Sequence, residues 1–358
     1  MTEWKEYKLG EIGTFGNGKV RPQKQGDIPI YGGNGILGYC DEYNYCGETI
    51  IVGRVGAYCG SVYYENRPIW VSDNALALKP KNNYNTKFIY YLLKKYNLNE
   101  YAEGSSHPLV TQTLLNAIEI IFTDDIEKQI RIAAILSSLD DKIELLHREN
   151  KTLEAMAETL FRQWFIEEAK EDWKEVSLTK IANFLNGLPC QKYPPKNNIE
   201  KLPVLKIREL SNGIGKDCDW ATTDIANEYI VSNGDVIFAW SASLMVKIWN
   251  GENCILNQHL FKVTSDKYPK WFYYFWCKYH LDEFITIAQS HATTMGHIKR
   301  KDLENAMVLV PTGNELKTMS KQIESLLQKI ENNNNEIKTL TQTRDGLLPK
   351  LMSGEVKI

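Results

Sequence analysis

Several familiar classes of protein are excluded by what this sequence lacks. The 358 residues contain seven cysteines, an odd number without a Cys-x-x-Cys pair, so neither a disulfide framework nor a zinc knuckle is expected. The six histidines have no metal-ligand spacing, and we expect no metal or other cofactor. No apolar run reaches the roughly 18 residues of a membrane span, and residues 1–10 lack the apolar core of a signal peptide. The sequence therefore predicts a globular cytoplasmic protein, long enough for two or three domains.

Motifs of catalysis and nucleotide binding are also missing. The stretch 13–19 resembles a phosphate-binding loop, but Val20 stands where the magnesium-binding hydroxyl belongs. The glycines of 33–38 match a dinucleotide fingerprint, yet a poor helix start follows, so a turn-rich loop is predicted. The only Pro-Pro pair, Pro194-Pro195, has the wrong flanks for the Asn/Asp-Pro-Pro-aromatic motif of a DNA amino-methyltransferase, and no nuclease or Ser/His/Asp pattern stands out. We expect a protein without catalytic activity of its own.

The charge of the chain is unevenly distributed. The net charge of −3 speaks mildly against a nucleic-acid partner. Residues 124–170, however, hold 11 acidic and 7 basic residues, which leaves the flanking segments close to neutral. A basic surface elsewhere in the chain is therefore compatible with the composition.

The chain contains an internal repeat. Residues 4–18 read WKEYKLGEIGTFGNG and residues 173–187 read WKEVSLTKIANFLNG, with eight of the fifteen positions identical. Weaker matches follow, and the offset between the halves grows from 169 to 187 residues, so the second half holds insertions. Similar ends around divergent middles predict one scaffold with two specificities.

Each half ends in a predicted long helix with a heptad pattern. Apolar residues recur in a and d positions over about five heptads, which is typical of a coiled coil. An amphipathic helix packed on a globular core is the alternative. The central seam residues are Leu139, Ile143, Leu146, Asn150 and Leu153 in the first helix, and Leu326, Ile330, Asn333, Ile337 and Leu340 in the second.

The segments before the helices have short β-type runs broken by Gly, Asn and Pro, with short helices expected near 86–96 and 269–285. The predicted fold class is therefore α+β, with two pseudo-repeated modules and two long antiparallel coiled-coil helices. The expected order is a module at 1–123, a helix at 124–170, a module at 171–311 and a helix at 312–358.

Two asparagines predict the register of the helices. A lone buried asparagine is costly, but two that face each other can form hydrogen bonds and fix the register. Setting Asn150 against Asn333 aligns apolar seam residues along both helices, and leaves only Leu139 against Arg344 mismatched. Both asparagines pointing to water at a bend is the alternative.

Loops that are rich in cations and amides follow equivalent landmarks in both modules. Arginine and lysine bind phosphates and guanine edges, and glutamine binds adenine edges. In 206–209 we expect an alternating strand with both cations on one face. The candidate DNA-binding residues are Lys19, Arg21, Lys24, Arg54, Gln191, Lys192, Lys206, Arg208, His297 and Lys299. Each stretch alone could equally be a solvated loop, but their joint occurrence favours binding.

This organisation resembles the specificity (S) subunit of type I restriction–modification enzymes over almost the whole chain. The resemblance rests on the repeated opening at 4–12 and 173–181, on LFRQWF at 160–165, and on the closing RDGLLPKLMSGE at 344–355. NQHLF at 257–261 and Thr293-Thr294-Met295-x-His297-Ile298 also look like patterns of that family.

The resemblance implies a DNA-binding, non-catalytic subunit without a cofactor. In that family two target-recognition domains each bind one half of a bipartite double-stranded DNA site, and the helical regions dock methyltransferase (M) subunits, two of which are expected here. M supplies the methylation chemistry, and restriction (R) subunits supply cleavage. The alternatives are a methyltransferase or restriction enzyme in its own right, which the missing motifs oppose, and a coiled-coil adaptor or scaffold that does not bind DNA.

Overall fold

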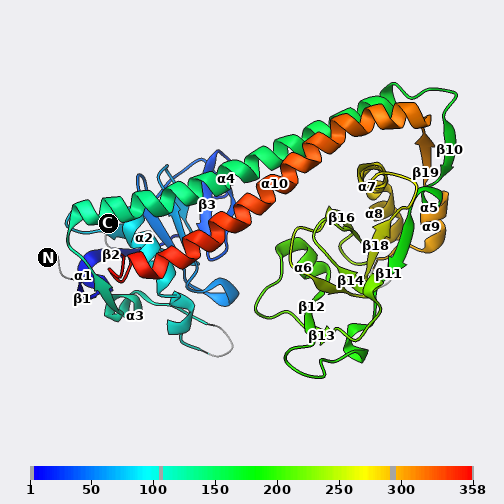
Figure 1. Cartoon of the computed structure of the whole chain (residues 1–358). Coiled ribbons are helices and arrows are strands. Elements are labelled where there is room, and N and C mark those ends of the chain that lie inside the picture. Colours follow the sequence, from blue (N-terminus) through cyan, green and yellow to red (C-terminus); the bar gives the residue numbers. More distant parts are fainter. Residues whose placement is uncertain (1–3, 105–107, 291–295, 357–358) are drawn as a thin grey trace. The chain divides into compact units, whose positions relative to one another are not determined.

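The computed structural model describes residues 4–104, 108–290 and 296–356, and Figure 1 labels many of its helices and strands. The chain packs as two compact units. Unit 1 comprises Met1–Leu145 and Ile337–Ile358, and unit 2 comprises Leu146–Glu336. Each unit therefore contains one of the two modules and a part of each long helix.

The module in unit 1 is built on two small sheets and a terminal strand pair. Strand β1 pairs with β9, and the sheets have the orders β2-β8-β5-β6 and β4-β3-β7, with β3 and β7 parallel. Its strands are β1 (Lys5–Lys8), β2 (Gly13–Asn17), β3 (Ile28–Gly32), β4 (Gly35–Cys40), β5 (Thr49–Gly53), β6 (Val62–Glu65), β7 (Trp70–Val71), β8 (Ala75–Pro80) and β9 (Glu119–Phe122). Its helices are α1 (Leu9–Ile12), η1 (Gly56–Tyr58), α2 (Thr86–Lys95), η2 (Leu98–Tyr101) and α3 (Gln112–Ala117).

The module in unit 2 repeats this plan. Strand β10 pairs with β19, and the sheets have the orders β11-β18-β15-β16 and β13-β12-β17-β14, with β12 and β17 parallel. Its strands are β10 (Lys174–Ser177), β11 (Asn183–Asn186), β12 (Lys201–Leu205), β13 (Trp220–Thr222), β14 (Ile230–Val231), β15 (Val236–Ala239), β16 (Met245–Ile248), β17 (Cys254–Leu256), β18 (Leu260–Thr264) and β19 (Met307–Val310). Its helices are α5 (Leu178–Ile181), η4 (Cys190–Lys192), α6 (Ile207–Asn212), η5 (Asn227–Tyr229), α7 (Lys270–Tyr279), α8 (Leu281–Ser290) and α9 (Arg300–Asn305).

The apolar residues of the repeated opening form the core of each module. Leu9, Ile12 and Phe15 are buried in unit 1, and Leu178, Ile181 and Phe184 occupy the same places in unit 2. Aromatic side chains of α2 and α7 pack on the β2 and β11 sheets within the same clusters. The identities that reveal the repeat therefore specify a shared hydrophobic core.

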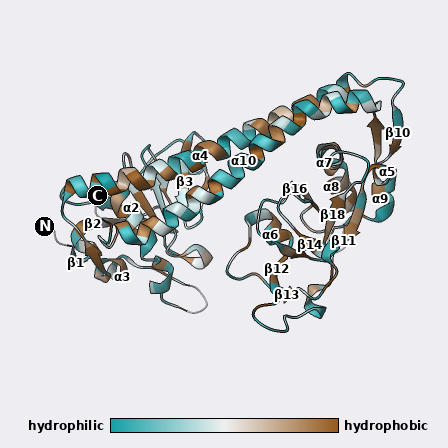
Figure 2. Ribbon diagram, viewed as in Figure 1, coloured by the Kyte–Doolittle hydropathy of each residue, from teal (hydrophilic) through white to brown (hydrophobic). Residues whose placement is uncertain are grey.

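The two long helices are α4 (Ile126–Arg162), which continues into the π-helical turn η3 (Gln163–Glu167), and α10 (Gly313–Leu351). Figure 2 shows hydrophobic and hydrophilic residues interspersed along both helices, as expected for a narrow apolar seam. Of the ten seam residues named above, Leu146 and Asn333 are buried and the other eight are half-buried. None of the helices in the described ranges is both long and apolar enough to cross a membrane.

Within each unit the helix segments pack in the predicted register. In unit 2, Asn333 Nδ2 donates to Asn150 Oδ1 at 2.9 Å, so the predicted asparagine pair is confirmed. In unit 1, the guanidinium of Arg344 has a polar partner, because its Nη1 donates to Asp140 Oδ1 at 2.7 Å. The mismatch that the sequence predicted at Leu139 is thus resolved by the neighbouring carboxylate.

Three local predictions need correction. Lys206 and Arg208 do not alternate on a strand, because β12 ends at Leu205 and 207–212 form helix α6, which ends at Gly213 with a φ of +83°. The helix expected at 269–285 is two helices, α7 and α8, which meet at His280. The segment 33–38 was predicted as a turn-rich loop, but only its first two residues form a turn, and the rest belongs to strand β4 of the β3–β4 hairpin.

Candidate nucleic-acid interface

A tripeptide in each module is held by the same set of backbone hydrogen bonds. The tripeptides are Ser72–Asn74 in unit 1 and Asn257–His259 in unit 2, and each lies between a strand of the smaller sheet and a strand of the larger one. In unit 1 the four bonds are Ser72 N to Tyr31 O, Asp73 N to Lys19 O, Arg54 N to Asn74 O and Ala75 N to Ser72 O, at 2.8 to 3.0 Å. In unit 2 they are Asn257 N to Leu205 O, Gln258 N to Leu188 O, Trp240 N to His259 O and Leu260 N to Asn257 O, at 2.8 to 3.3 Å.

Two repeated glycines make this frame possible. A Cβ atom on Gly18 would overlap the backbone carbonyl of Ser72, and a Cβ on Gly187 would overlap that of Asn257. Only glycine allows the two backbones to approach this closely. The identity of Gly18 and Gly187 in the repeat therefore reflects the same contact, and it fixes the tripeptides at corresponding positions of the two modules.

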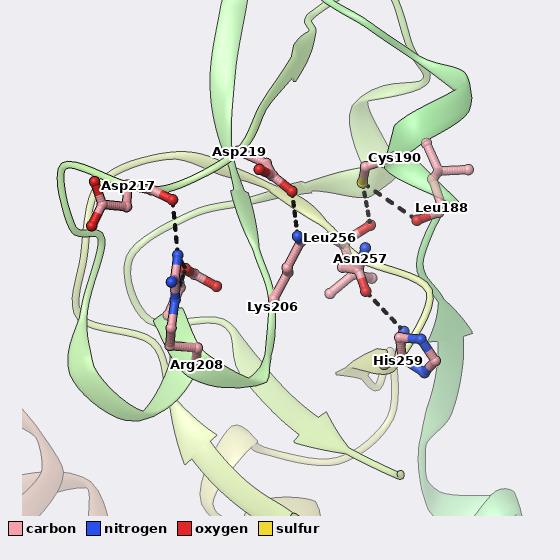
Figure 3. A network of polar contacts seen from close by, with 10 residues as sticks. Leu188, Cys190, Lys206, Arg208, Asp217, Asp219, Leu256, Asn257 and His259 are labelled. Carbon is pink, nitrogen blue, oxygen red and sulfur yellow. Dashed lines mark hydrogen bonds and ion pairs between the residues drawn. The ribbon is translucent and has the colours of Figure 1, made fainter. Parts of the chain in front are cut away.

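In unit 2 the tripeptide forms part of a hollow of about 620 Å³. The hollow is lined by Cys190, Gln191, Pro194, Pro195, Val204, Lys206, Ile207, Arg208, Asp219, Trp220, Asn257, Gln258 and His259. Figure 3 shows the polar groups of this region, where side chains from the ends of β12 and β17 and from α6 meet. Burial raises the pKa of the Cys190 thiol, so this group stays neutral at physiological pH.

The two cations of the hollow are paired with acidic or carbonyl groups. Lys206 forms an ion pair with Asp219, which lowers the pKa of the Asp219 carboxyl. Arg208 donates from Nε to the buried Glu209 at 2.8 Å. It also donates from Nη2 to the carbonyl of Asp217 at 2.9 Å, a contact that Figure 3 shows. Side chains of both cations remain exposed, by 44% for Lys206 and 61% for Arg208, so a phosphate could reach them.

A row of aromatic and imidazole groups borders the hollow. His259 Nδ1 lies 3.0 Å from Ser241 Oγ, and its Nε2 lies 3.3 Å from the amide nitrogen of Gln258. The Trp240 ring contacts His259 and His297, and its Nε1 donates to Asn186 Oδ1 at 3.1 Å. The sequence indicated 257–261 only as a family pattern, so Gln258 and His259 were not selected as site residues. Trp240 and Ser241 were missed because no motif or charge marks them.

In unit 1 the two cations beside the tripeptide are those that the sequence selected. Lys19 is exposed and contacts it through the backbone bond to Asp73. Arg54 is half-buried and occupies the place of Trp240, and its buried Nε has no hydrogen-bond partner within the described residues. The structure therefore brings Lys19 and Arg54 together at the frame of 72–74.

The other candidates are more scattered. Arg21 is exposed, and Lys24 forms an ion pair with Asp41 while remaining 81% exposed. Gln191 and Lys192 lie in η4, and Gln191 lines the hollow. His297 pairs through its backbone with Ser241, and Lys299 precedes α9 as its exposed N-cap. Thr293, Thr294 and Met295 lie outside the described residues.

Comparison with known proteins agrees with this architecture. The chain is similar in fold to the crystal structure of the S subunit of a type I restriction–modification system from M. genitalium, with a TM-score of 0.62, 18% identity, and coverage of 98% of this chain and 96% of that one. The fold thus defines a two-module protein with paired long helices. The family model described as "Type I restriction modification DNA specificity domain" matches residues 1–155 and 170–342, and the chain belongs to this family.

Curated relatives extend the match over nearly the full length. The MjaIX specificity subunit of Methanocaldococcus jannaschii is 25% identical over 99% of this chain and 94% of its own length. The MjaVIII specificity subunit of the same organism is 24% identical over 85% of this chain and 78% of its own length. The protein is therefore a DNA specificity subunit of a type I restriction–modification system, and such a subunit is not catalytic.

Proposed function

We propose that each module is a target-recognition domain that binds one half of a bipartite DNA site. The observation that carries this proposal is the repeated tripeptide frame, which holds different side chains in the same backbone setting in the two modules. A shared backbone frame with different polar side chains is the arrangement expected of two DNA-binding domains with different base preferences. The corresponding domains are 1–123 and 171–311, separated by helical regions at 124–170 and 312–358.

The proposed DNA contacts fall into two groups. The cations would bind phosphates, while the amide and imidazole groups would contact base edges. The proposed residues are Lys19, Arg21, Lys24 and Arg54 in the first module, and Gln191, Lys192, Lys206, Arg208, His297 and Lys299 in the second. Because Lys206 is paired with Asp219, a phosphate would have to replace that carboxylate.

The helical regions would space the modules and dock methyltransferase subunits. The seam residues hold α4 and α10 together, which leaves the exposed faces of both helices for partners. Two M subunits, one for each half, and further R subunits would complete the enzyme, which we place in the cytoplasm. No cofactor of the S subunit is part of the proposal.

Salt-dependent DNA binding by the purified M–S complex tests this function. Counterion release makes the logarithm of affinity fall linearly with the logarithm of salt concentration, and each lost phosphate contact lowers that slope by about 1. We expect this for Lys206→Ala and Arg208→Ala, and a higher affinity for Asp219→Asn, which leaves Lys206 unpaired. The exposed Lys267, outside the hollow, supplies the control Lys267→Ala.

The same titration separates this proposal from a coiled-coil adaptor. An adaptor would assemble with its partners but show no salt-dependent affinity for DNA. Lys206→Ala, Arg208→Ala and Asp219→Asn would then leave the DNA titration unchanged. Such a result would refute the proposed recognition role.

A further inference from the structure

We propose that the middle residue of each tripeptide selects a base, and that Gln258 selects adenine while Asp73 selects cytosine. This inference rests on the proposed function and names the residues that carry its specificity. Both residues occupy the same place in their modules. The backbone N–H of each donates to the carbonyl of the residue that follows the repeated glycine, Gly18 or Gly187. The remainder of the frame is backbone, so the side chain at this place can vary without loss of the fold.

The position is rigid, as base readout requires. Each tripeptide is bonded on one side to the smaller sheet, at Tyr31 or Leu205, and on the other to the segment after β5 or β15, at Arg54 or Trp240. The glycine contact closes the third side. A side chain on such a frame loses little further conformational entropy on binding, which favours discrimination between bases.

The side chain of Gln258 is oriented by its neighbours. The side-chain nitrogen Nε2 of Gln258 can only donate, so His259 Nε2 accepts this hydrogen bond at 3.3 Å. The hydrogen of the imidazole ring is then on Nδ1, which donates it to Ser241 Oγ at 3.0 Å. One N–H and the oxygen Oε1 of Gln258 remain for a ligand, and within the described ranges neither has a hydrogen-bond partner. This adjacent donor and acceptor match N7 and the N6 amino group of adenine in the major groove.

Asp73 offers different chemistry at the equivalent place. Its side chain is exposed, and its carboxylate has no hydrogen bond or ion pair among the described residues. A carboxylate only accepts hydrogen bonds and is repelled by phosphates, so against DNA it suits the N4 amino group of cytosine. Lys19 and Arg54, on either side of the tripeptide, would offset its charge near the DNA backbone.

The experiment uses the M–S complex and its own target, which is first read from the methylated sites in a strain expressing both subunits. Binding is then measured to duplexes in which every base pair of each half-site is changed in turn. Wild type should discriminate one A·T pair of one half-site by roughly 5- to 150-fold, and Gln258→Leu should abolish that discrimination alone. Adenine replaced by 7-deazaadenine at this pair should weaken wild type but not Gln258→Leu.

Further variants keep the test decisive. Gln258→Asp should shift the preferred pair from A·T to C·G, and Asp73→Gln should shift one pair of the other half-site in the opposite sense. Ser241→Ala, which frees the imidazole of His259, should reduce discrimination at the A·T pair only and leave the salt slope unchanged. Gln289→Leu replaces an exposed glutamine of α8 outside the hollow and should change no preference.

The two proposals fail in distinguishable ways. If Gln258→Leu and Gln258→Asp complexes assemble with M and bind DNA with the wild-type base profile, the base-selecting role is overturned while DNA recognition stands. If the wild-type complex itself shows no salt-dependent DNA binding, the proposed function falls first. A variant that fails to assemble with M is replaced by Gln258→Glu, which keeps the shape of the side chain but removes its donor and should also lose the A·T preference.

Discussion

At the scale of single residues, the asparagine pair shows how a polar contact sets a helix register. Asn333 is 1% exposed, and its Nδ2 donates to Asn150 Oδ1 at 2.9 Å and to Glu149 Oε2 at 3.1 Å. Asn150 in turn donates to Asn334 Oδ1 at 2.8 Å. A shift of one heptad would place these amides against apolar side chains, and each buried amide left unpaired would cost about 1–3 kcal/mol. The pair therefore favours one register at the expense of stability.

Replacing the two asparagines singly and together separates these effects. Asn150→Leu should lower the free energy of unfolding by about 1–3 kcal/mol, because Asn333 stays buried and loses a partner. The double variant Asn150→Leu/Asn333→Leu should be at least as stable as wild type, since Asn333 Oδ1 is already buried without a hydrogen bond among the described residues. Urea unfolding measures both. Equal destabilisation by the single and the double change would contradict this explanation.

The close approach at Gly187 makes a second prediction at this scale. Gly187→Ala would force the tripeptide 257–259 away from the β11–η4 segment, at a cost of about 1–3 kcal/mol in the free energy of unfolding. The displaced tripeptide should also weaken DNA discrimination by the second module. Gly215→Ala is the matched control, because an added Cβ there meets no atom within 4 Å. Thermal unfolding of both variants checks the prediction, which fails if they lose the same stability.

At the scale of secondary-structure elements, each module is fastened to α4 by a tyrosine at an equivalent place. Tyr91 of α2 donates to Asp140 at 2.7 Å in unit 1, and Tyr274 of α7 donates to Glu154 at 2.9 Å in unit 2. Burial, with the adjacent carboxylate second, raises the pKa of both phenols, so they remain donors. Lys278 strengthens the contact in unit 2 through ion pairs with Glu154 and Glu158.

The ion pairs of α7 predict a pH dependence for unit 2. Burial acts to raise the pKa of Glu154, but hydrogen bonds from Lys278 and Tyr274 outweigh it and hold the pKa below the usual 4.5. Burial acts to lower the pKa of Lys278, but Glu158 and Glu154 outweigh it and hold the pKa above 10.5. The stabilisation is thus present between about pH 4.5 and 10.5. It is lost as the pH falls through the folded pKa of Glu154 or rises through that of Lys278.

Lys278→Met measures this contribution. Because both carboxylates are partly exposed, the variant should lose about 1 kcal/mol or less at pH 7. The difference in urea midpoint between wild type and variant should shrink as the pH is lowered below 4.5. Lys267→Met, at an exposed lysine of the same unit, should show no such dependence. A difference that stays constant down to pH 3 would show that packing, and not the ion pairs, is responsible.

How far the sequence predicted these elements depended on the range of the interactions. The long helices and the asparagine register followed from local periodicity, since the contacts repeat every heptad. The alternation at 206–209 wrongly predicted a strand, because four residues are too few to distinguish a strand from one helical turn. The buried Leu210 and the glycine after Asn212 favour the helix α6 instead. The tripeptide frame was out of reach, because its partners Leu188, Leu205 and Trp240 come from three distant segments.

At the scale of the whole molecule, the repeat accounts for both constancy and divergence. Identities between the two halves concentrate in the opening strand, helix and glycine of each module, which form the core and the frame. The insertions that enlarge the offset fall in the second module, whose smaller sheet has one additional strand. The residues that form the shared core and frame are thus largely distinct from those that differ between the modules. This separation implies that a module can be exchanged without rebuilding the scaffold.

Exchange of residues 171–311 for the second module of another family member tests this modularity. The junctions lie just before β10 and just after β19, whose pairing closes the module upon itself, so the exchange should preserve folding and assembly with M. Sequencing of methylated sites in a strain expressing the hybrid and its M subunit should show one half of the target replaced and the other retained. Reintroducing the native module should restore the original site. A change in both halves, or in neither, would mean that the two modules do not recognise DNA independently.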